Sequence, residues 1–230
     1  MKTVGLLGGM SWESTEHYYR LINEGVRNAL GGLHSASIAM VSVDFADIET
    51  LQHTGDWSET ARILTDKACQ VEAAGADFLL ICTNTMHKVA DEIANAIGIP
   101  LIHIADATAQ AINASGITNI GLLGTRFTME QDFYRSKLEQ SGLSVVVPSA
   151  ADRQRVHDII YKELCVGQVS DRSRATYLDV IDGLQRQGAQ GIIAGCTEIG
   201  LLINQSHLSL PLFDTTAIHA QSAVDAALAD

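Results

Sequence analysis

The sequence predicts an α/β fold, and three observations lead to that class. Short apolar runs rich in β-branched residues alternate along the chain with amphipathic stretches of ten to eighteen residues. Most of the apolar runs lack polar alternation, which is typical of parallel strands buried on both faces. The same order of elements then recurs later in the chain, so we expect two similar α/β halves.

The individual elements follow from these periods and from the positions of glycine. Strands are predicted at Val4–Gly8, Ala36–Val43, Asp77–Ile81, Leu101–Ile104, Ile117–Leu123, Leu143–Val147, Gly191–Ala194 and Leu210–Phe213. Helices are predicted at Ser11–Leu30, Trp57–Ala74, Met86–Ile97, Asp106–Ala114, Met129–Ser141, Asp152–Leu164, Arg172–Gln187 and Thr215–Leu228. Five of these helices stop at a glycine that suits a left-handed C-terminal cap, namely Gly75, Gly98, Gly116, Gly142 and Gly188.

An internal repeat sets the predicted domain organisation. Val4–Gly8 recurs as Ile120–Gly124 at an offset of 116 residues, and Gly98–Ile102 recurs as Leu208–Leu212 at an offset of 111. Between them, Glu72–Thr83 recurs as Arg186–Thr197, which places Cys82 opposite Cys196 at an offset of 114. We therefore predict a first half over residues 1–105 and a second over 106–213, with the C-terminal helix 214–230 packing on the first.

Composition and charge exclude several classes of protein. The 230 residues are 47% hydrophobic and 18% charged, which indicates a globular chain with a substantial core. The net charge is −12 and the aromatic residues do not interleave with basic patches, so nucleic acid is not an expected partner. The apolar start at Val4–Leu7 is too short for a signal or a membrane span. We expect a cytoplasmic protein whose four cysteines are free thiols.

Two of the cysteines lie where an α/β protein binds ligands. Cys82 and Cys196 each follow a predicted strand, and ligands of open parallel sheets sit beyond the carboxyl ends of the strands. If the halves face each other about a pseudo-twofold axis, both thiols enter one cleft. Each precedes a predicted helix start, which would lower the thiol pKa, while Thr83–Thr85 and Thr197 would hold a carboxylate. Packing is the alternative for each thiol, and it is the favoured interpretation for Cys69 and Cys165.

Other common sites find no support in the sequence. The eight histidines form no persuasive metal-ligand pair, so no metal is expected. The Gly8-Gly9-Met10-Ser11 turn is equally consistent with a ligand loop and a plain tight turn, and it lacks the spacing of a dinucleotide fingerprint. There is no G-x-S-x-G elbow. The acidic residues Asp44, Asp47 and Glu49 are most simply a solvated loop.

Three segments give the chain a family resemblance. Cys82-Thr83-Asn84-Thr85-Met86-His87, Gly195-Cys196-Thr197-Glu198 and Gly5-Leu6-Leu7-Gly8-Gly9-Met10 resemble the aspartate/glutamate racemase family of cofactor-independent amino-acid racemases. The resemblance extends over essentially the whole chain. It implies two flavodoxin-like halves that clamp a small amino acid between them, usually in a homodimer, with no pyridoxal phosphate or metal.

The resemblance also implies roles for residues. Cys82 and Cys196 would be the two acid/base groups, one removing the α-proton while the other delivers a proton to the opposite face. Hydrogen bonds from Thr83, Asn84 and Thr85 would stabilise the developing carbanion. Met10 and Gln52 match positions that line the family's pocket, and Glu198 is a candidate for contacting the ammonium group or the nearby thiol.

Departures from the family pattern bear on the substrate. Where aspartate-specific members carry a cation after the second strand, this sequence has Glu49, and a second cationic position is matched by Cys165, one turn after Lys162. We therefore expect broad or neutral polar substrates, with aspartate and glutamate possible. The alternatives are a cysteine-dependent decarboxylase or a cis/trans isomerase of unsaturated diacids on the same fold, or a non-catalytic two-lobed binding protein.

Overall fold

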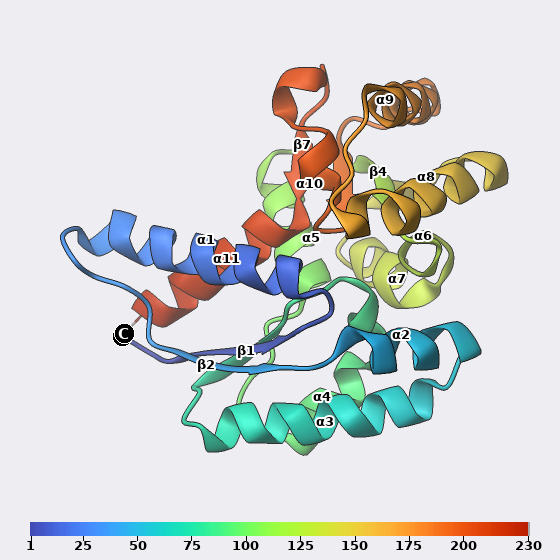
Figure 1. Ribbon diagram of the computed structural model, residues 1–230. Coiled ribbons are helices and arrows are strands. Elements are labelled where there is room, and N and C mark those ends of the chain that lie inside the picture. Colours follow the sequence, from blue (N-terminus) through green and yellow to red (C-terminus); the bar gives the residue numbers. More distant parts are fainter. Residues whose placement is uncertain (230) are drawn as a thin grey trace. The chain divides into compact units, whose positions relative to one another are not determined.

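The chain divides into two compact units, each built on its own parallel sheet (Figure 1). The computed structural model describes residues 1–229. Unit 1 contains Met1–Ile104 and the chain from His219 onward, and unit 2 contains Ala105–Ile218. The fold class predicted from the sequence, α/β with two parallel-sheet halves, is confirmed.

Unit 1 has a three-stranded sheet in the order β2-β1-β3. Its elements are β1 (Val4–Gly8), α1 (Trp12–Leu30), β2 (Ile38–Ser42), α2 (Phe45–Thr54), α3 (Trp57–Ala73), β3 (Phe78–Ile81), the 3₁₀ turn η1 (Thr85–Val89), α4 (Ala90–Ala96) and most of α11 (Thr215–Leu228). Residue 230, the end of the predicted C-terminal helix, lies outside the described residues.

Unit 2 has a four-stranded sheet in the order β5-β4-β6-β7. Its elements are α5 (Ile104–Ala114), β4 (Asn119–Gly124), α6 (Arg126–Glu130), α7 (Asp132–Gln140), β5 (Ser144–Val146), α8 (Ala150–Lys162), η2 (Leu164–Val166), α9 (Asp171–Arg186), β6 (Ile192–Gly195), α10 (Ile199–Leu202), η3 (Gln205–His207) and β7 (Leu212–Asp214).

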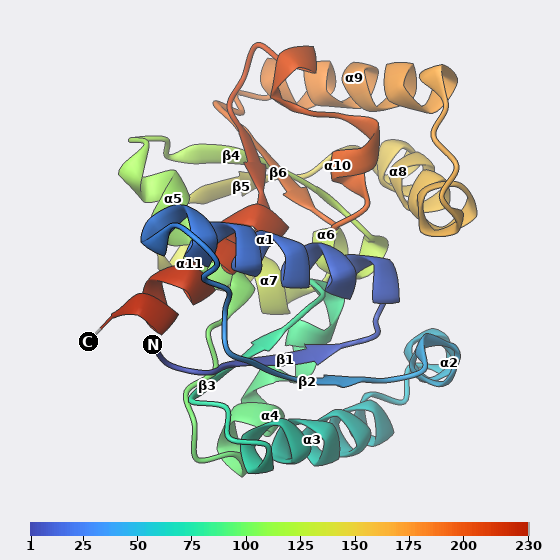
Figure 2. The same cartoon turned by 60° about the vertical axis from the view of Figure 1, so that its left-hand side comes forward.

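The core of unit 1 consists of two apolar clusters, one on each face of its sheet, and successive strand residues contribute to them in alternation. Leu79 and Ile81 of β3 pack with α3 and α4 on one face. Phe78, Leu80 and Cys82 pack on the other face, where α1 and α11 lie (Figure 2). Both faces are covered by helices, so the apolar runs of the sequence carry no polar alternation. The carboxyl ends of the strands are left as the edge from which polar loops emerge.

The strand registers correct one of the three repeat offsets. Ile81 of β3 pairs with Leu7 of β1, and Ala194 of β6 pairs with Leu123 of β4. Leu7 and Leu123 correspond at the predicted offset of 116. Ile81 therefore corresponds to Ala194, and the offset of this segment is 113 rather than 114.

Backbone hydrogen bonds support the corrected offset. Asp77 N donates to Thr3 O at 2.9 Å in unit 1, and Gln190 N donates to Asn119 O at 2.8 Å at the matching place in unit 2. The third predicted offset, 111, is confirmed in the same way, because Leu79 N donates to the carbonyl of Pro100 and Ile192 N donates to that of Pro211.

Several predicted elements differ from the observed ones. The acidic segment after β2 is not a loop but the helix α2, which Asp44 caps by accepting from Ala46 N. Leu101 forms only an isolated bridge to Leu79, and α5 already begins at Ile104. The helix predicted over 129–141 is two helices, α6 and α7, joined at Gln131, whose backbone is extended.

Four of the five predicted glycine caps have the positive φ that such a cap needs. They are Gly75, Gly116, Gly142 and Gly188. Gly98 is the exception, because α4 ends earlier, at Ala96, and the chain then continues through Ile97 in extended conformation. In residues 1–229 every helix is too short or too polar to cross a bilayer.

Candidate active site

The carboxyl end of β3 carries the polar segment of unit 1. Thr83 is partly buried there, and Asn84 and Thr85 are buried at the start of η1. Met10 follows β1 at the same end of the sheet and is buried against the face covered by α3. Gln52 lies on α2 and is only 2% exposed, which is unusual for an amide side chain.

Cys82 points into the core of unit 1. Its side chain continues the alternation of Phe78 and Leu80, is fully buried, and packs in the cluster that contains Tyr18. Burial raises the pKa of the Cys82 thiol well above its ordinary value. The thiol therefore lies among apolar groups rather than at the edge of the sheet.

The correspondence between the two cysteines that the sequence suggested is wrong. With the corrected offset, Cys82 matches Gly195, and Thr83 is the residue that matches Cys196. The sequence alignment slipped by one residue because apolar strands of similar composition match almost equally well at neighbouring offsets. The hydroxyl of Thr83 thus takes the place in unit 1 that the Cys196 thiol takes in unit 2.

In unit 2, Cys196 is paired with a carboxylate. The Cys196 thiol donates to Glu198 Oε2 at 2.9 Å, and the Thr197 hydroxyl donates to the same oxygen at 2.7 Å. Glu198 is 8% exposed, so this carboxylate is largely removed from water. The arrangement places a proton acceptor directly beside the thiol.

The pKa of Cys196 moves in the direction opposite to the sequence expectation. Burial raises it well above its ordinary value, and the negative charge of Glu198 and the hydrogen bond to it act in the same direction. The expected lowering relied on a helix starting after the thiol. That helix, α10, has only four residues, so its dipole is too small to offset burial.

Two further side chains, Tyr177 and Cys165, interact electrostatically with Cys196, although the sequence suggested no role for Tyr177 and favoured packing for Cys165. Tyr177 on α9 is fully buried, and its pKa is raised by burial and by the charges of Cys196, Cys165 and Glu198. Cys165, in η2, also acts on the pKa of Cys196. The helical period of α9 marks Tyr177 as an ordinary core residue, so no sequence signal distinguished it.

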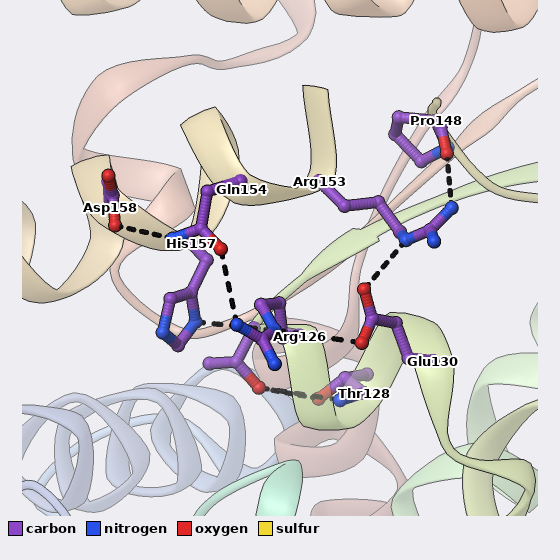
Figure 3. A network of polar contacts seen from close by, with 9 residues as sticks. Arg126, Thr128, Glu130, Pro148, Arg153, Gln154, His157 and Asp158 are labelled. Carbon is purple, nitrogen blue, oxygen red and sulfur yellow. Dashed lines mark hydrogen bonds and ion pairs between the residues drawn. The ribbon is translucent and has the colours of Figure 1, made fainter. Parts of the chain in front are cut away.

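Lys162, at the last position of α8, is engaged by its own helix. Its ammonium group lies 3.1 Å from Asp158 Oδ2, and its side chain is 72% exposed. Asp158 in turn accepts from Gln154 Nε2 at 2.8 Å. Gln154 accepts from Arg126 Nη1 at 3.2 Å, which joins α8 to α6 (Figure 3).

Arg126 is a further cation near the end of β4 that was not predicted to be a site residue. It follows β4 and corresponds to Met10 at the offset of 116. Its backbone N donates to His157 Nδ1 at 3.3 Å, and its guanidinium lies 3.6 Å from Glu130, which also accepts from Arg153 (Figure 3). Glu49 is likewise paired, with His53 at 2.9 Å.

Among residues 1–229, no three His, Cys, Asp or Glu side chains are grouped closely enough to hold a metal ion. The chemistry that the side chains themselves supply differs between the two strand ends. In unit 2 it is a thiol, a carboxylate and a hydroxyl, and in unit 1 it is hydroxyls and amides. These groups can transfer protons and bind a carboxylate.

Replacing Glu198 with glutamine is expected to make Cys196 more reactive toward an alkylating reagent. Removing the carboxylate charge lowers the thiol pKa, and each unit of lowering gives about tenfold more thiolate at a fixed pH below that pKa. Iodoacetamide labelling at pH 8, followed by peptide mass spectrometry, measures the rate. Thr197→Val, which keeps the charge, serves as control, and a slower rate in Glu198→Gln would contradict the assignment.

The chain is similar over nearly its whole length to a family of racemases and to several of their relatives. The model of the family described as Asp/Glu/hydantoin racemase matches residues 7–223. A solved structure of a candidate Asp/Glu racemase from Yersinia pestis is 57% identical, with a TM-score of 0.94 and 100% of both chains covered. An aspartate racemase homologue from Pyrococcus horikoshii is 33% identical, with a TM-score of 0.86 and 99% of both chains covered. The broad specificity amino-acid racemase RacX of Bacillus subtilis is 24% identical over 98% of both chains.

Proposed function

Because the chain belongs to the Asp/Glu/hydantoin racemase family, we propose that it interconverts L- and D-amino acids by acid/base chemistry of its own side chains, with no cofactor. The observation that carries this proposal is the Cys196–Glu198 pair at the end of β6, where a thiol lies 2.9 Å from a largely buried carboxylate. Such a pair suits the removal of a weakly acidic proton from carbon.

Glu198 has a defined role in this proposal. It accepts the hydrogen bond of the Cys196 thiol, and its charge makes the thiolate that forms when this proton is lost to solvent a stronger base toward the α-proton of the substrate. The raised pKa of Cys196 makes that thiolate rare but strongly basic, and a strong base is what an α-proton requires. The reverse transfer returns a proton to the same face of the carbanion.

Thr83 is the group that we propose for the opposite face. It corresponds to Cys196 in the strand register and is partly exposed, whereas Cys82 lies in the core. The two-cysteine mechanism that the sequence suggested is the alternative. Either version requires that the two groups reach opposite faces of one α-carbon. Asn84, Thr85 and Thr197 then hold the substrate carboxylate, and Met10 and Gln52 line its surroundings.

A hydroxyl opposite a thiol makes the two faces unequal. A threonine hydroxyl donates a proton to a carbanion but is almost never ionised, so removal of the proton on that face is slow. The equilibrium constant of racemisation is one, so kcat/KM is equal in both directions. The difference between the two faces appears instead in hydrogen exchange. The enantiomer whose α-proton faces Cys196 exchanges that proton with solvent while it keeps its configuration.

Proton exchange in heavy water tests the proposed function directly. Incubation of an amino acid with the protein is expected to introduce deuterium at the α-carbon and to abolish optical activity. A binding protein or a decarboxylase would leave the α-carbon of the recovered amino acid unlabelled. An isomerase would instead act on an unsaturated diacid such as maleate, and a 5-substituted hydantoin tests the other substrate named by the family. No labelling of any amino acid would refute the proposal.

We propose that the enzyme accepts a broad range of amino acids. The cation Lys162 is paired with Asp158, and Glu49, which is paired with His53, stands at the position where the family resemblance puts the cation of aspartate-specific members. RacX, a relative over the whole chain, is a broad-specificity enzyme. Racemisation rates of aspartate, glutamate, homoserine and methionine measure the range, and an exclusive preference for aspartate would overturn this part.

The proposed enzyme acts in the cytoplasm as a homodimer, and an exposed face of α1 supports the second point. Trp12, Tyr19 and Leu30 are 67%, 50% and 47% exposed and lie on one face of the helix, since they are separated by nearly whole turns. Glu16 and Arg27 lie on the same face. In an antiparallel pair of α1 helices, Trp12 would meet Leu30 of the second copy and Glu16 would approach Arg27.

Charge reversal on α1 tests this interface. Glu16→Arg and Arg27→Glu are each expected to weaken the dimer at least about tenfold, because each leaves like charges facing each other. The double variant restores opposite charges and should restore the dimer, as measured by sedimentation or light scattering. Asp66→Arg on α3 is the control. Monomeric wild-type protein, or single variants that remain dimeric, would refute the interface.

A further inference from the structure

Three buried histidines meet in unit 1 near the two points where the chain passes between the units. The ring centroids of His87 and His103 are 4.5 Å apart, and those of His87 and His219 are 5.7 Å apart. The chain leaves unit 1 after Ile104 and returns at His219. Among the described residues these histidines are not arranged so that they could hold a metal ion together, so their proximity calls for another explanation.

Both ring nitrogens of His87 contact the backbone. Nδ1 lies 2.8 Å from the carbonyl oxygen of Thr83, and Nε2 accepts from Ile104 N at 3.2 Å. A carbonyl can only accept and a backbone N–H can only donate. The ring is therefore the neutral tautomer with its proton on Nδ1.

The surroundings keep this ring neutral. Burial lowers the pKa of His87, and the neighbouring His103 and His219 lower it further. His219 is held similarly, with Nε2 donating to Ile102 O at 2.8 Å and Nδ1 accepting from the Tyr18 hydroxyl at 2.9 Å. Burial lowers the pKa of His219 to about 4. The hydrogen-bond pattern is thus fixed at neutral pH.

Two successive carbonyls at the end of β3 are held by side chains. Ser14 Oγ, on α1, donates to the carbonyl of Cys82 at 2.8 Å, and His87 Nδ1 donates to the carbonyl of Thr83. Both donors are buried. Together they fix the peptide planes on either side of Thr83, and hence the direction in which its side chain leaves the backbone.

We propose that His87 is a positioning residue for racemisation, which orients Thr83 by holding its carbonyl and ties that strand end to the backbone of Ile104. The inference rests on the proposed function of Thr83. His87 does not touch the substrate in this role. Because a small misplacement of a reacting group costs a large factor in rate, loss of this one hydrogen bond should appear in turnover.

Two amide substitutions separate the two contacts of the ring. In His87→Asn the side-chain amide nitrogen takes the place of Nδ1 and keeps the donor to Thr83. In His87→Gln the amide reaches the position of Nε2 and loses that donor. We expect His87→Gln to lower kcat roughly 10- to 100-fold with little change in KM, and His87→Asn to retain kcat within a few-fold.

His219→Gln is the matched control, because it disturbs the same buried cluster without touching Thr83. It is expected to lower the melting temperature but not kcat. If His87→Gln and His87→Asn lose activity equally, or if neither does, the positioning role is overturned while the proposed function stands. If the wild-type protein exchanges no α-proton, the proposed function falls, and the positioning role falls with it.

Discussion

Replacing Cys196 with alanine is expected to slow α-proton exchange by at least about 1000-fold. The thiol is the one strong base that the proposal places at the strand ends, and an acid/base group typically contributes a factor of 100 to 10,000. Glu198 is not expected to substitute for it, because carboxylates as a class are weaker bases than thiolates. Deuterium incorporation followed by NMR measures the loss.

Two alanine variants in unit 1 show whether Thr83 or Cys82 acts on the face of the α-carbon opposite Cys196. Thr83→Ala should abolish inversion while leaving exchange with retention in one enantiomer, since Cys196 still works alone on its face. Cys82→Ala should change the rate only a few-fold, because that side chain lies in the core. The opposite pattern, with Cys82→Ala inactive and Thr83→Ala near normal, would restore the two-cysteine mechanism. A Cys196→Ala variant with nearly full exchange would refute both.

Replacing Gly9 with alanine is expected to lower the free energy of unfolding by about 3 kcal/mol or more. Gly9 has a φ of +92°, and a Cβ there would lie 2.2 Å from Val43 O and 2.5 Å from Val43 N. These are backbone atoms, and the Val43 N–H also bonds to Gly8 O at 3.0 Å, so the segment cannot move aside without losing that bond. Urea denaturation provides the measurement.

Gly55→Ala is the control for this substitution. Gly55 also has a positive φ, +78°, but nothing lies within 4 Å of the Cβ position. Its replacement should cost only about 1 kcal/mol, from the left-handed conformation alone. If the two variants were equally stable, crowding against Val43 would not be the reason for glycine at position 9.

Much of the fold could be predicted from the sequence because its signals are local. Apolar runs without alternation identified β1 and β4, and amphipathic periods identified α1, α3 and α9. The helix α2 was missed because its hydrophobic pattern is weak, with Ile48 and Gln52 as its buried side chains, and polar residues around Asp44 suit a loop as well as a cap. The strand at Leu101 was overpredicted because an apolar run does not reveal whether a neighbouring strand is long enough to pair with it.

By itself, the sequence determined the fold class, the duplication and the family, and it singled out Cys196 and Glu198 as candidate site residues. These rest on periodicity, similarity along the chain and residues that are neighbours in sequence. Only the tertiary structure decided that Thr83, not Cys82, corresponds to Cys196, and that His87 donates a hydrogen bond to the Thr83 carbonyl. The physical reason is that successive side chains of a strand point to opposite faces. A shift of one residue, almost invisible in an alignment, therefore moves a side chain from the edge of the sheet into the core.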